Sequence, residues 1–334
     1  MILSSKATLR WQRAATAGLA LAAAALIGAC GGGTSQLEPF VAERVFVFGD
    51  ESSLLRSDGK RYGVNGLDTT VTPGVFNCNH NPLWVQSVAA YYGYVFAECN
   101  TALAPAQPKA FMRAAAGPVG IGNGTKVADV AAQVEVQAAA GGLHDKDLVL
   151  VLAGANDVLE IYVRFKNDPT LSEASLLAEA RARGEQMAGV VNRLVELGAK
   201  VVVANLADLG MSPYARAEAL ANAGVDIDRA ALITRLTNAF NERLGVKVLL
   251  DGRFVGLVQM DLRTQSAARS PGSFGLTDVS TAVCTVALPD CDDSTVPTGA
   301  SSATFLWADA TRLGPGGQSQ LATLALQRVQ RNPF

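Results

Sequence analysis

The sequence predicts a three-layer α/β/α fold in which a central parallel sheet lies between two layers of helices. Several short runs are apolar at every position rather than at alternate positions, as in residues 148–152, Leu-Val-Leu-Val-Leu. Such runs indicate strands that are buried on both faces. Long helical stretches separate them, as the crossover connections of a parallel sheet require. We expect strands at 45–48, 148–152, 201–203 and 255–260, and helices at 82–92, 127–140, 171–197, 230–250 and 319–331.

Residues 1–29 are predicted to be a lipoprotein signal peptide. Lys6, Arg10 and Arg13 precede an apolar stretch that is too short to cross a hydrocarbon core of about 30 Å comfortably. The stretch ends in Ile-Gly-Ala-Cys, where small residues suit the signal protease and the Cys30 thiol accepts the lipid. No Asp follows the cysteine, so we expect an outer-membrane lipoprotein of the cell envelope, facing the periplasm or the cell surface.

Residues 30–40 begin with Cys30 and a run of glycines and are predicted to be a flexible tether, which leaves 41–334 as a single domain. The 28 basic and 30 acidic residues nearly balance, and apolar residues make up 49% of the chain. This composition predicts a sizeable core and no binding of nucleic acid. No second apolar run reaches about 18 residues, so the lipid is the expected contact with the membrane. Residues 57–80 and 264–303 are expected to be loop-rich insertions.

Four cysteines other than Cys30 remain after removal of the signal peptide, and an even number in an exported chain indicates disulfides. Of the three possible pairings we expect Cys78 with Cys99 and Cys284 with Cys291, because the first pair brackets a helical stretch and the second closes a tight loop. A zinc site is the competing interpretation. Neither spacing is Cys-x-x-Cys, and His80 is a lone imidazole, so we expect no metal and no cofactor.

Three segments at predicted strand or helix boundaries resemble the sequence blocks of the SGNH (GDSL) ester-hydrolase family. Residues 45–50, Val-Phe-Val-Phe-Gly-Asp, resemble the strand and first two residues of the Gly-Asp-Ser-Leu block. Residues 154–157, Gly-Ala-Asn-Asp, match the Gly-x-Asn-Asp block, and 309–312, Asp-Ala-Thr-Arg, stand where the family carries Asp-x-x-His. Residues 205–210 and 274–279 support the alignment. The resemblance implies a flavodoxin-like sheet with the site at the carboxyl ends of its strands.

The resemblance also implies a catalytic triad and an oxyanion hole, and this chain departs from the triad. In the family the Ser after Gly-Asp is the nucleophile, and Asp-x-x-His supplies the base and its orienting carboxylate. Here Glu51 stands at the nucleophile position and Arg312 at the base position, while Asp309 and the oxyanion-hole residue Asn156 are retained. Arginine cannot act as a general base near neutral pH.

The glycine of the oxyanion hole has two candidates. Gly117 fits the residues that precede the family's glycine, and Gly124 fits those that follow it. We rank Gly117 first. Of the two histidines, His144 is expected in a polar turn at the amino end of the sheet, opposite the site. His80 lies in an insertion that could fold over the site, so it is the less implausible replacement for the missing base.

A shift of one residue would make Ser52 an alternative nucleophile. Helix geometry opposes this shift, because one further residue turns a side chain by about 100° around the helix axis. The competing interpretation is that Ser52 and Ser53 satisfy free backbone N–H groups at a helix start. Glu51 and Arg312 are expected to form an ion pair, with Asp309 as a second partner of the guanidinium.

A glycosidase that uses Glu51 and Asp309 as acid and base is a further alternative. An adjacent arginine would keep both carboxylates ionised and remove the proton donor. We therefore expect an SGNH-like envelope lipoprotein that has lost ester hydrolysis and acts in binding or assembly, with a small-molecule, glycan or lipid-ester ligand in the old cleft. The alternative is an active ester hydrolase (carboxylesterase, lipase or acetyl-esterase) that uses Ser52.

Overall fold

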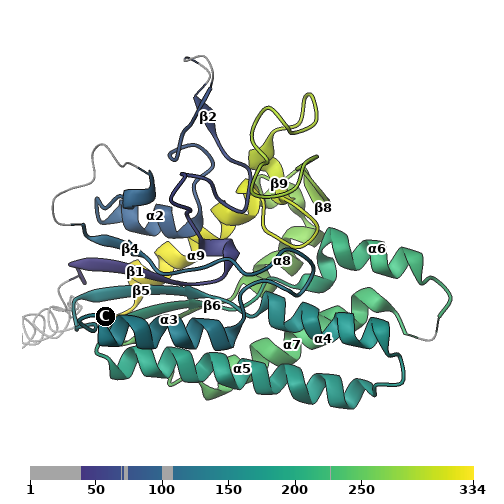
Figure 1. The fold of residues 1–334 in the computed structure, drawn as a ribbon, viewed down its shortest axis with the longest axis horizontal. Coiled ribbons are helices and arrows are strands. Elements are labelled where there is room, and N and C mark those ends of the chain that lie inside the picture. Colours follow the sequence, from purple (N-terminus) through teal and green to yellow (C-terminus); the bar gives the residue numbers. More distant parts are fainter. Residues whose placement is uncertain (1–38, 69, 71–73, 100–107, 226) are drawn as a thin grey trace, which may run out of the picture. The chain divides into compact units, whose positions relative to one another are not determined.

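A parallel sheet of five strands, in the order β4-β1-β5-β6-β7, lies at the centre of the computed structural model (Figure 1). The structure describes residues 39–334 except 69, 71–73, 100–107 and 226, so the predicted signal peptide and nearly all of the tether lie outside it. The described chain forms one compact unit. The strands are β1 Arg44–Gly49, β4 Ala110–Met112, β5 Asp147–Leu152, β6 Lys200–Ala204 and β7 Val255–Val258.

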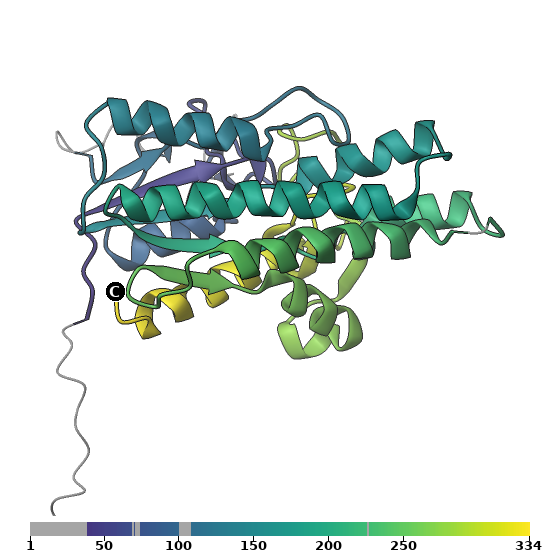
Figure 2. The same cartoon turned by 90° about the horizontal axis from the view of Figure 1, so that it is seen from below.

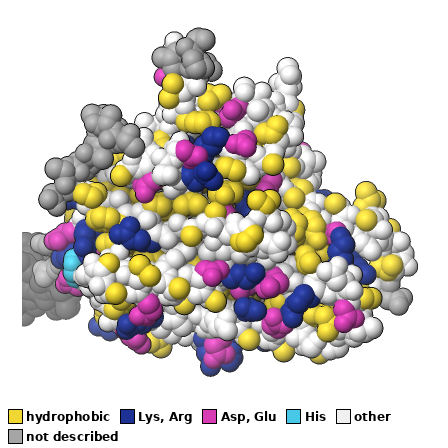
Figure 3. Space-filling view, viewed as in Figure 1, with side chains coloured by type: hydrophobic (Ala, Val, Ile, Leu, Met, Phe, Trp, Pro, Cys, Tyr) yellow, Lys and Arg dark blue, Asp and Glu magenta, His cyan; other side chains and the backbone are white. Residues whose placement is uncertain are grey.

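Helices cover both faces of this sheet, which confirms the predicted three-layer class. Helices α2 Trp84–Tyr91 and α9 Pro315–Arg331 lie on one face. The other face carries α3 Val127–Ala139, α5 Glu173–Glu196 and α7 Arg229–Lys247 (Figure 2). Basic and acidic side chains lie interspersed on the surface of these helices (Figure 3), and pairs such as Arg193–Glu135 and Arg243–Glu185 link neighbouring helices.

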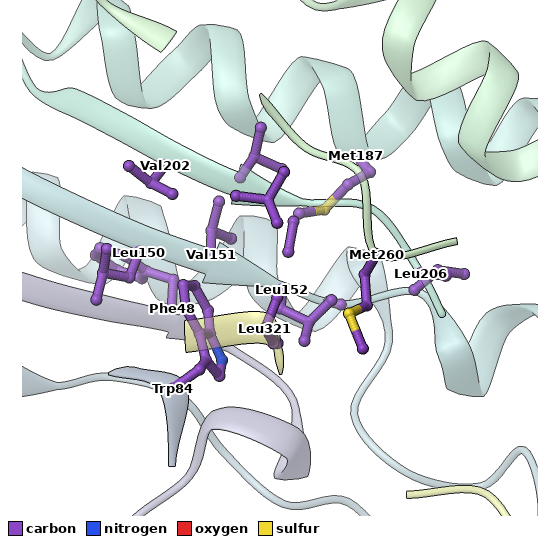
Figure 4. Close-up of a cluster of buried hydrophobic side chains, with 14 of the residues drawn as sticks. Phe48, Trp84, Leu150, Val151, Leu152, Met187, Val202, Leu206, Met260 and Leu321 are labelled. Atoms are coloured by element: carbon purple, nitrogen blue, oxygen red, sulfur yellow. The ribbon is translucent and has the colours of Figure 1, made fainter. Parts of the chain in front are cut away.

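The hydrophobic core lies on both faces of the sheet around strands β1 and β5. Every residue of β5 is buried, as its continuous apolar pattern predicts for an inner strand. Figure 4 shows Phe48 of β1 beside Trp84 of α2 on one face of the sheet, and Met187 of α5 on the other. The Trp84 indole also donates a hydrogen bond to Ser53 Oγ at 3.0 Å, which ties α2 to the segment that follows β1.

Several elements were not predicted. Strand β4 has only three residues at the edge of the sheet, too few to show a period. The predicted helix at 171–197 begins at Glu173 and ends at Glu196, and a separate helix precedes it, starting inside the Gly-Ala-Asn-Asp segment. The additional helices are α4 Ala155–Asn167, α6 Pro213–Ala221 and α8 Met260–Arg269, and short 3₁₀ turns are η1 Glu51–Ser53, η2 Ala97–Cys99, η3 Leu209–Met211, η4 Pro271–Phe274 and η5 Ser302–Thr304.

The two insertions carry the disulfides. Cys78 is bonded to Cys99 and Cys284 to Cys291, as predicted. The first insertion contains the antiparallel pair β2 Leu67–Asp68 and β3 Val75–Phe76, and the second contains β8 Asp278–Ala282, which pairs with β9 Phe305–Trp307. The first six residues of the second insertion, 264–269, belong to α8 rather than to a loop. Asn65 joins the insertions, since its amide donates to the carbonyl oxygens of Pro289 and Cys291. Within the described ranges, no helix has the length and apolarity needed to cross a membrane.

Candidate functional site

The candidate site lies where β1 ends, at the carboxyl edge of the sheet. Gly49 has a φ of +143°, and a Cβ atom there would lie 2.2 Å from the carbonyl oxygen of Leu152 on the neighbouring strand. Only glycine therefore lets the chain turn this close to β5. The next residue, Asp50, caps the turn, because its carboxylate accepts a hydrogen bond from the Ser52 backbone N–H at 2.9 Å. This turn directs Glu51 inward, and that residue is only 2% exposed.

Three N–H groups surround the buried Glu51 carboxylate. Its Oε1 atom accepts hydrogen bonds from the backbone N–H groups of Gly117, at 3.0 Å, and Thr125, at 3.1 Å. Its Oε2 atom accepts one from Asn156 Nδ2 at 2.9 Å. Hydrogen bonds to an ionised acceptor are stronger than neutral ones, and they compensate for the removal of the carboxylate from water.

This set of donors includes the residues predicted for the oxyanion hole. Asn156 lies in the first turn of α4, and its Nδ2 atom also donates to the Thr125 carbonyl oxygen at 3.0 Å, which holds the amide toward Glu51. Gly117 donates its backbone N–H, whereas Gly124 matters because it has no side chain that would collide with Glu51 and Asn156. A Cβ atom on Gly124 would lie 2.2 Å from Glu51 Oε1 and 2.4 Å from Asn156 Nδ2. The Thr125 donor was not predicted from the sequence, because its backbone N–H is a group that every residue type except proline carries.

Arg312 and Asp309 form a second group at this edge. Asp309 Oδ1 accepts hydrogen bonds from the backbone N–H groups of Thr311 and Arg312, and Oδ2 accepts one from Arg312 Nη1 at 2.9 Å. The guanidinium also lies over the Tyr62 ring, 5.6 Å from its centroid. Burial lowers the pKa of Arg312, but the negative charges of Asp309 and Glu51 outweigh it and raise that pKa above its usual value. Arg312 therefore stays charged.

The expected direct ion pair between Glu51 and Arg312 does not form. Among the described residues no cation lies within 4.0 Å of the Glu51 carboxylate, and Arg312 pairs with Asp309. The reason is competition. The oxygens of Glu51 already accept three hydrogen bonds, and a partner three residues away is easier for Arg312 to reach than one across the site. Charge still acts between the two groups through space, as the raised pKa of Arg312 shows.

The family model for GDSL-like lipases and acylhydrolases matches residues 81–291, well over half of the chain. The chain belongs to the GDSL-like lipase/acylhydrolase family. The matched segment contains Gly117, Gly124 and Asn156, whereas Glu51 and Asp309 lie on either side of it. The correspondence of these two positions with the family's catalytic residues thus depends on the motifs and on where the fold places them.

Solved structures similar to this GDSL-like chain include two acetyl xylan esterases. AlAXEase is 13% identical, with a TM-score of 0.42, and the alignment covers 85% of this chain and 98% of the esterase. A variant of an acetyl xylan esterase from Geobacillus stearothermophilus is 14% identical, with a TM-score of 0.37, and the alignment covers 87% of this chain and 96% of the esterase. A search of curated proteins gave no match.

Asp50 is a second buried carboxyl group next to Glu51 and was not singled out from the sequence. It is 1% exposed. Burial raises its pKa, and the charge of Glu51 raises it further, to about 7, against the opposing effects of the Ser52 hydrogen bonds and of Arg312. The Gly-Asp pair of the GDSL-like motif was the available signal. A group that is half-protonated near neutral pH therefore lies inside this site.

The two serines after Glu51 have different environments. Ser53 is fully buried, and its hydroxyl accepts the hydrogen bond from Trp84. Ser52 and Asp50 line a cavity of about 30 Å³ whose other walls are mostly apolar, including Leu152 and Trp307. This volume holds one or two water molecules. Asp50, rather than either serine side chain, caps the turn, so the predicted capping role belongs to the residue two positions before Ser52.

Neither histidine joins the candidate site. His144 lies at the amino edge of the sheet beside Arg44 and Asp147, where the sequence places it. His80 is exposed in the first insertion, and its ring lies 3.8 Å from the Asp293 carboxylate. The structure therefore gives no support to His80 as the replacement for the missing base.

Proposed function

We propose that this chain is a non-catalytic member of the GDSL-like family that binds rather than cleaves its ligand. The observation that carries this proposal is the position of the Glu51 carboxylate, which accepts hydrogen bonds from Gly117, Thr125 and Asn156. An oxyanion hole works by donating such N–H groups to the charge that develops on a substrate carbonyl oxygen. The carboxylate occupies these donors, so no substrate oxygen can use them.

The second support is the loss of the proton acceptor. Ester hydrolysis by a serine triad requires a base that takes the proton of the nucleophile and returns it to the leaving group. Arg312 stands at that position, and its pKa is raised rather than lowered, because the nearby carboxylates outweigh burial. A guanidinium in this environment holds its protons. The nucleophile, the base and the free oxyanion hole are thus all missing together.

The proposal includes the setting of the protein, an outer-membrane lipoprotein anchored through Cys30. Two disulfides fit an oxidising compartment outside the cytoplasm. The Ile-Gly-Ala-Cys segment at residues 27–30 follows an apolar stretch, as lipidation requires. In this setting the protein acts in binding or assembly within the envelope, with a small-molecule, glycan or lipid-ester ligand at the old cleft.

A hydrolysis assay tests the proposal. The mature chain, with Cys30→Ser to keep it soluble, is incubated with p-nitrophenyl acetate and p-nitrophenyl butyrate, beside the matched variant Ser52→Ala. We expect both proteins to release p-nitrophenol at the same rate as a heat-unfolded sample. Hydrolysis by the parent chain that disappears in Ser52→Ala, with circular dichroism unchanged, would overturn the proposal.

One observation favours the alternative of an active ester hydrolase. Ser52 and Asp50 line the same cavity, the Asp50 carboxylate accepts a hydrogen bond from the Ser52 N–H, and its pKa of about 7 suits a general base. Against it, the predicted oxyanion-hole donors bond to Glu51. The Ser52→Ala comparison above separates the two functions.

A further inference from the structure

A basic groove runs along the outer edge of strand β7, away from the candidate site. Two adjoining cavities, of about 420 Å³ and 360 Å³, share Gln259, Arg328 and Arg331 as lining residues. Gln259 follows the carboxyl end of β7, and Gly252 precedes its amino end, so the joint groove follows the whole strand. Helices α8 and α9 form its walls.

The charge of this groove is of one sign. None of the residues that line either cavity is Asp or Glu, whereas Arg263, Arg328 and Arg331 all line it. Within the described part of the chain, no carboxylate lies within 4.0 Å of Arg328 or Arg331, although most surface arginines on the opposite helical layer have such partners. Both lie in the last turn of α9, where a positive charge also suits the helix end. The groove thus presents uncompensated guanidinium groups to an anion.

The groove opens beside the point where the described chain begins. Asn332 borders it and donates hydrogen bonds to the carbonyl oxygens of Gly252, at 3.1 Å, and Val255, at 3.0 Å. The Phe334 ring then packs edge-on against Phe40, with the ring centroids 5.7 Å apart. Both ends of the described chain lie at the amino edge of the sheet (Figures 1 and 2). Phe40 stands ten positions after the candidate lipid attachment site at Cys30, a reach of at most about 35 Å.

Exposed leucines stand at the same mouth. Leu249 is 66% exposed and Leu250 is 53% exposed, and Leu250 lines the groove. Apolar side chains next to arginines are the combination that enters the boundary between headgroups and acyl chains of a bilayer. Guanidinium groups bind phosphate oxygens through two parallel hydrogen bonds.

We propose that this groove docks the phosphate headgroups of anionic phospholipids in the membrane that carries the lipid anchor. The domain then rests on the bilayer with the amino edge of its sheet, and Arg328 and Arg331 contact headgroups while Leu250 enters the interface. Glu51 and Asn156 lie at the carboxyl edge and face away from that membrane. This proposal goes beyond the proposed non-catalytic function. A failed bilayer-binding test would overturn the docking and leave the non-catalytic function standing.

Vesicle sedimentation tests the docking. The mature chain with Cys30→Ser, which has no acyl chain to contribute, is mixed with vesicles of phosphatidylcholine alone or of phosphatidylcholine and phosphatidylglycerol in equal amounts. We expect sedimentation with the anionic vesicles only, weakening as salt is added. Arg328→Gln/Arg331→Gln should lower the partition coefficient about 25-fold, since each basic residue near an anionic surface contributes roughly fivefold.

The matched control removes the same charge elsewhere. Arg181 on α5 and Arg216 on α6 are exposed and do not line the groove. Arg181→Gln/Arg216→Gln should leave binding within about twofold of the parent chain, because it changes the net charge of the protein but none of the groove residues. Equal loss in both double variants, or equal binding to neutral vesicles, would overturn the proposal. So would absent vesicle binding together with Arg328-dependent binding of poly-glutamate, which would identify the groove as an acidic-peptide site.

Discussion

Asn156 Nδ2 lies 2.9 Å from Glu51 Oε2, so the amide that the sequence predicts for an oxyanion hole holds a carboxylate of the same chain. Two backbone N–H groups share the other oxygen of Glu51. The donors predicted for the oxyanion hole therefore lie together, and all of them bond to Glu51. The following predictions test what this arrangement does.

If the chain is non-catalytic as proposed, placing Ser and His at the predicted nucleophile and base positions should produce ester hydrolysis. Glu51→Ser frees the donors at Gly117 and Asn156, and Arg312→His supplies a base that Asp309 can orient. We expect the double variant to hydrolyse p-nitrophenyl acetate at least about 100-fold faster than Glu51→Ser alone, the usual contribution of a general base. Adding Asn156→Ala should reduce the rate again by about 100-fold. A folded double variant that is no faster than Glu51→Ser would show that the scaffold no longer aligns these positions.

Glu51→Gln should destabilise the fold. The amide oxygen can keep the two backbone bonds, but its NH₂ then faces the NH₂ of Asn156, and two donors cannot bond to each other. We expect a loss of about 1–3 kcal/mol in the free energy of unfolding, measured by urea denaturation at an unchanged slope. The control is Glu135→Gln, which breaks only an exposed pair with Arg193 and should cost under about 0.5 kcal/mol. Similar small losses in both variants would contradict a structural role for the Glu51 carboxylate.

Arg312 should couple energetically to Asp309 more than to Glu51. The guanidinium bonds to Asp309 at 2.9 Å, whereas no ion pair joins it to Glu51 among the described residues. In double-mutant cycles with alanine we expect a coupling of about 1 kcal/mol for Arg312 and Asp309, and under about 0.5 kcal/mol for Arg312 and Glu51. The opposite order would mean that Arg312 and Glu51 are in direct contact in solution.

Asp50 should make the protein less stable as pH rises toward 7. Its pKa is raised from 3.8 to about 7 in the folded state, so between these values the folded protein binds a proton that the unfolded chain has lost. Stability is therefore full below about pH 4 and declines up to about pH 7, by an amount on the order of 4 kcal/mol. Asp50→Asn should flatten this decline in urea midpoints between pH 5 and 8.

The control for this pH effect is Asp251→Asn. The pKa of Asp251 is lowered to about 2, mainly by its hydrogen bonds with Arg253, so its contribution is present above pH 4 and constant from 5 to 8. Asp251→Asn should shift every midpoint equally and leave the slope with pH unchanged. If Asp50→Asn also leaves the slope unchanged, the carboxyl of Asp50 does not titrate in this range.

Cys30 should carry the lipid. Metabolic labelling with a fatty-acid probe should mark the parent chain and not Cys30→Ser, because the thiol is the acceptor. Equal labelling of both proteins would exclude this attachment site. Loss of labelling with retained vesicle binding would show that the anchor and the basic groove act separately.

The sequence by itself determined the fold class, the disulfides and the residue types at the site. Continuous apolar runs such as residues 148–152 predict buried parallel strands because hydrophobic burial depends on composition and period. Asn156 and Asp309 could be named because their side chains follow recognisable motifs. Elements without a strong period, such as β4 and α8, were missed, since packing rather than local pattern keeps them in place.

Only the tertiary structure decided how the replaced residues are used. The sequence indicates opposite charges at positions 51 and 312, and pairing them was the natural expectation. The fold instead brings the backbone N–H groups of Gly117 and Thr125 to Glu51, and every residue type except proline carries such a group. Arg312 meanwhile bonds to Asp309, three residues away. Charge and residue type can be read along the chain, but the choice among several possible partners depends on distances that only folding sets.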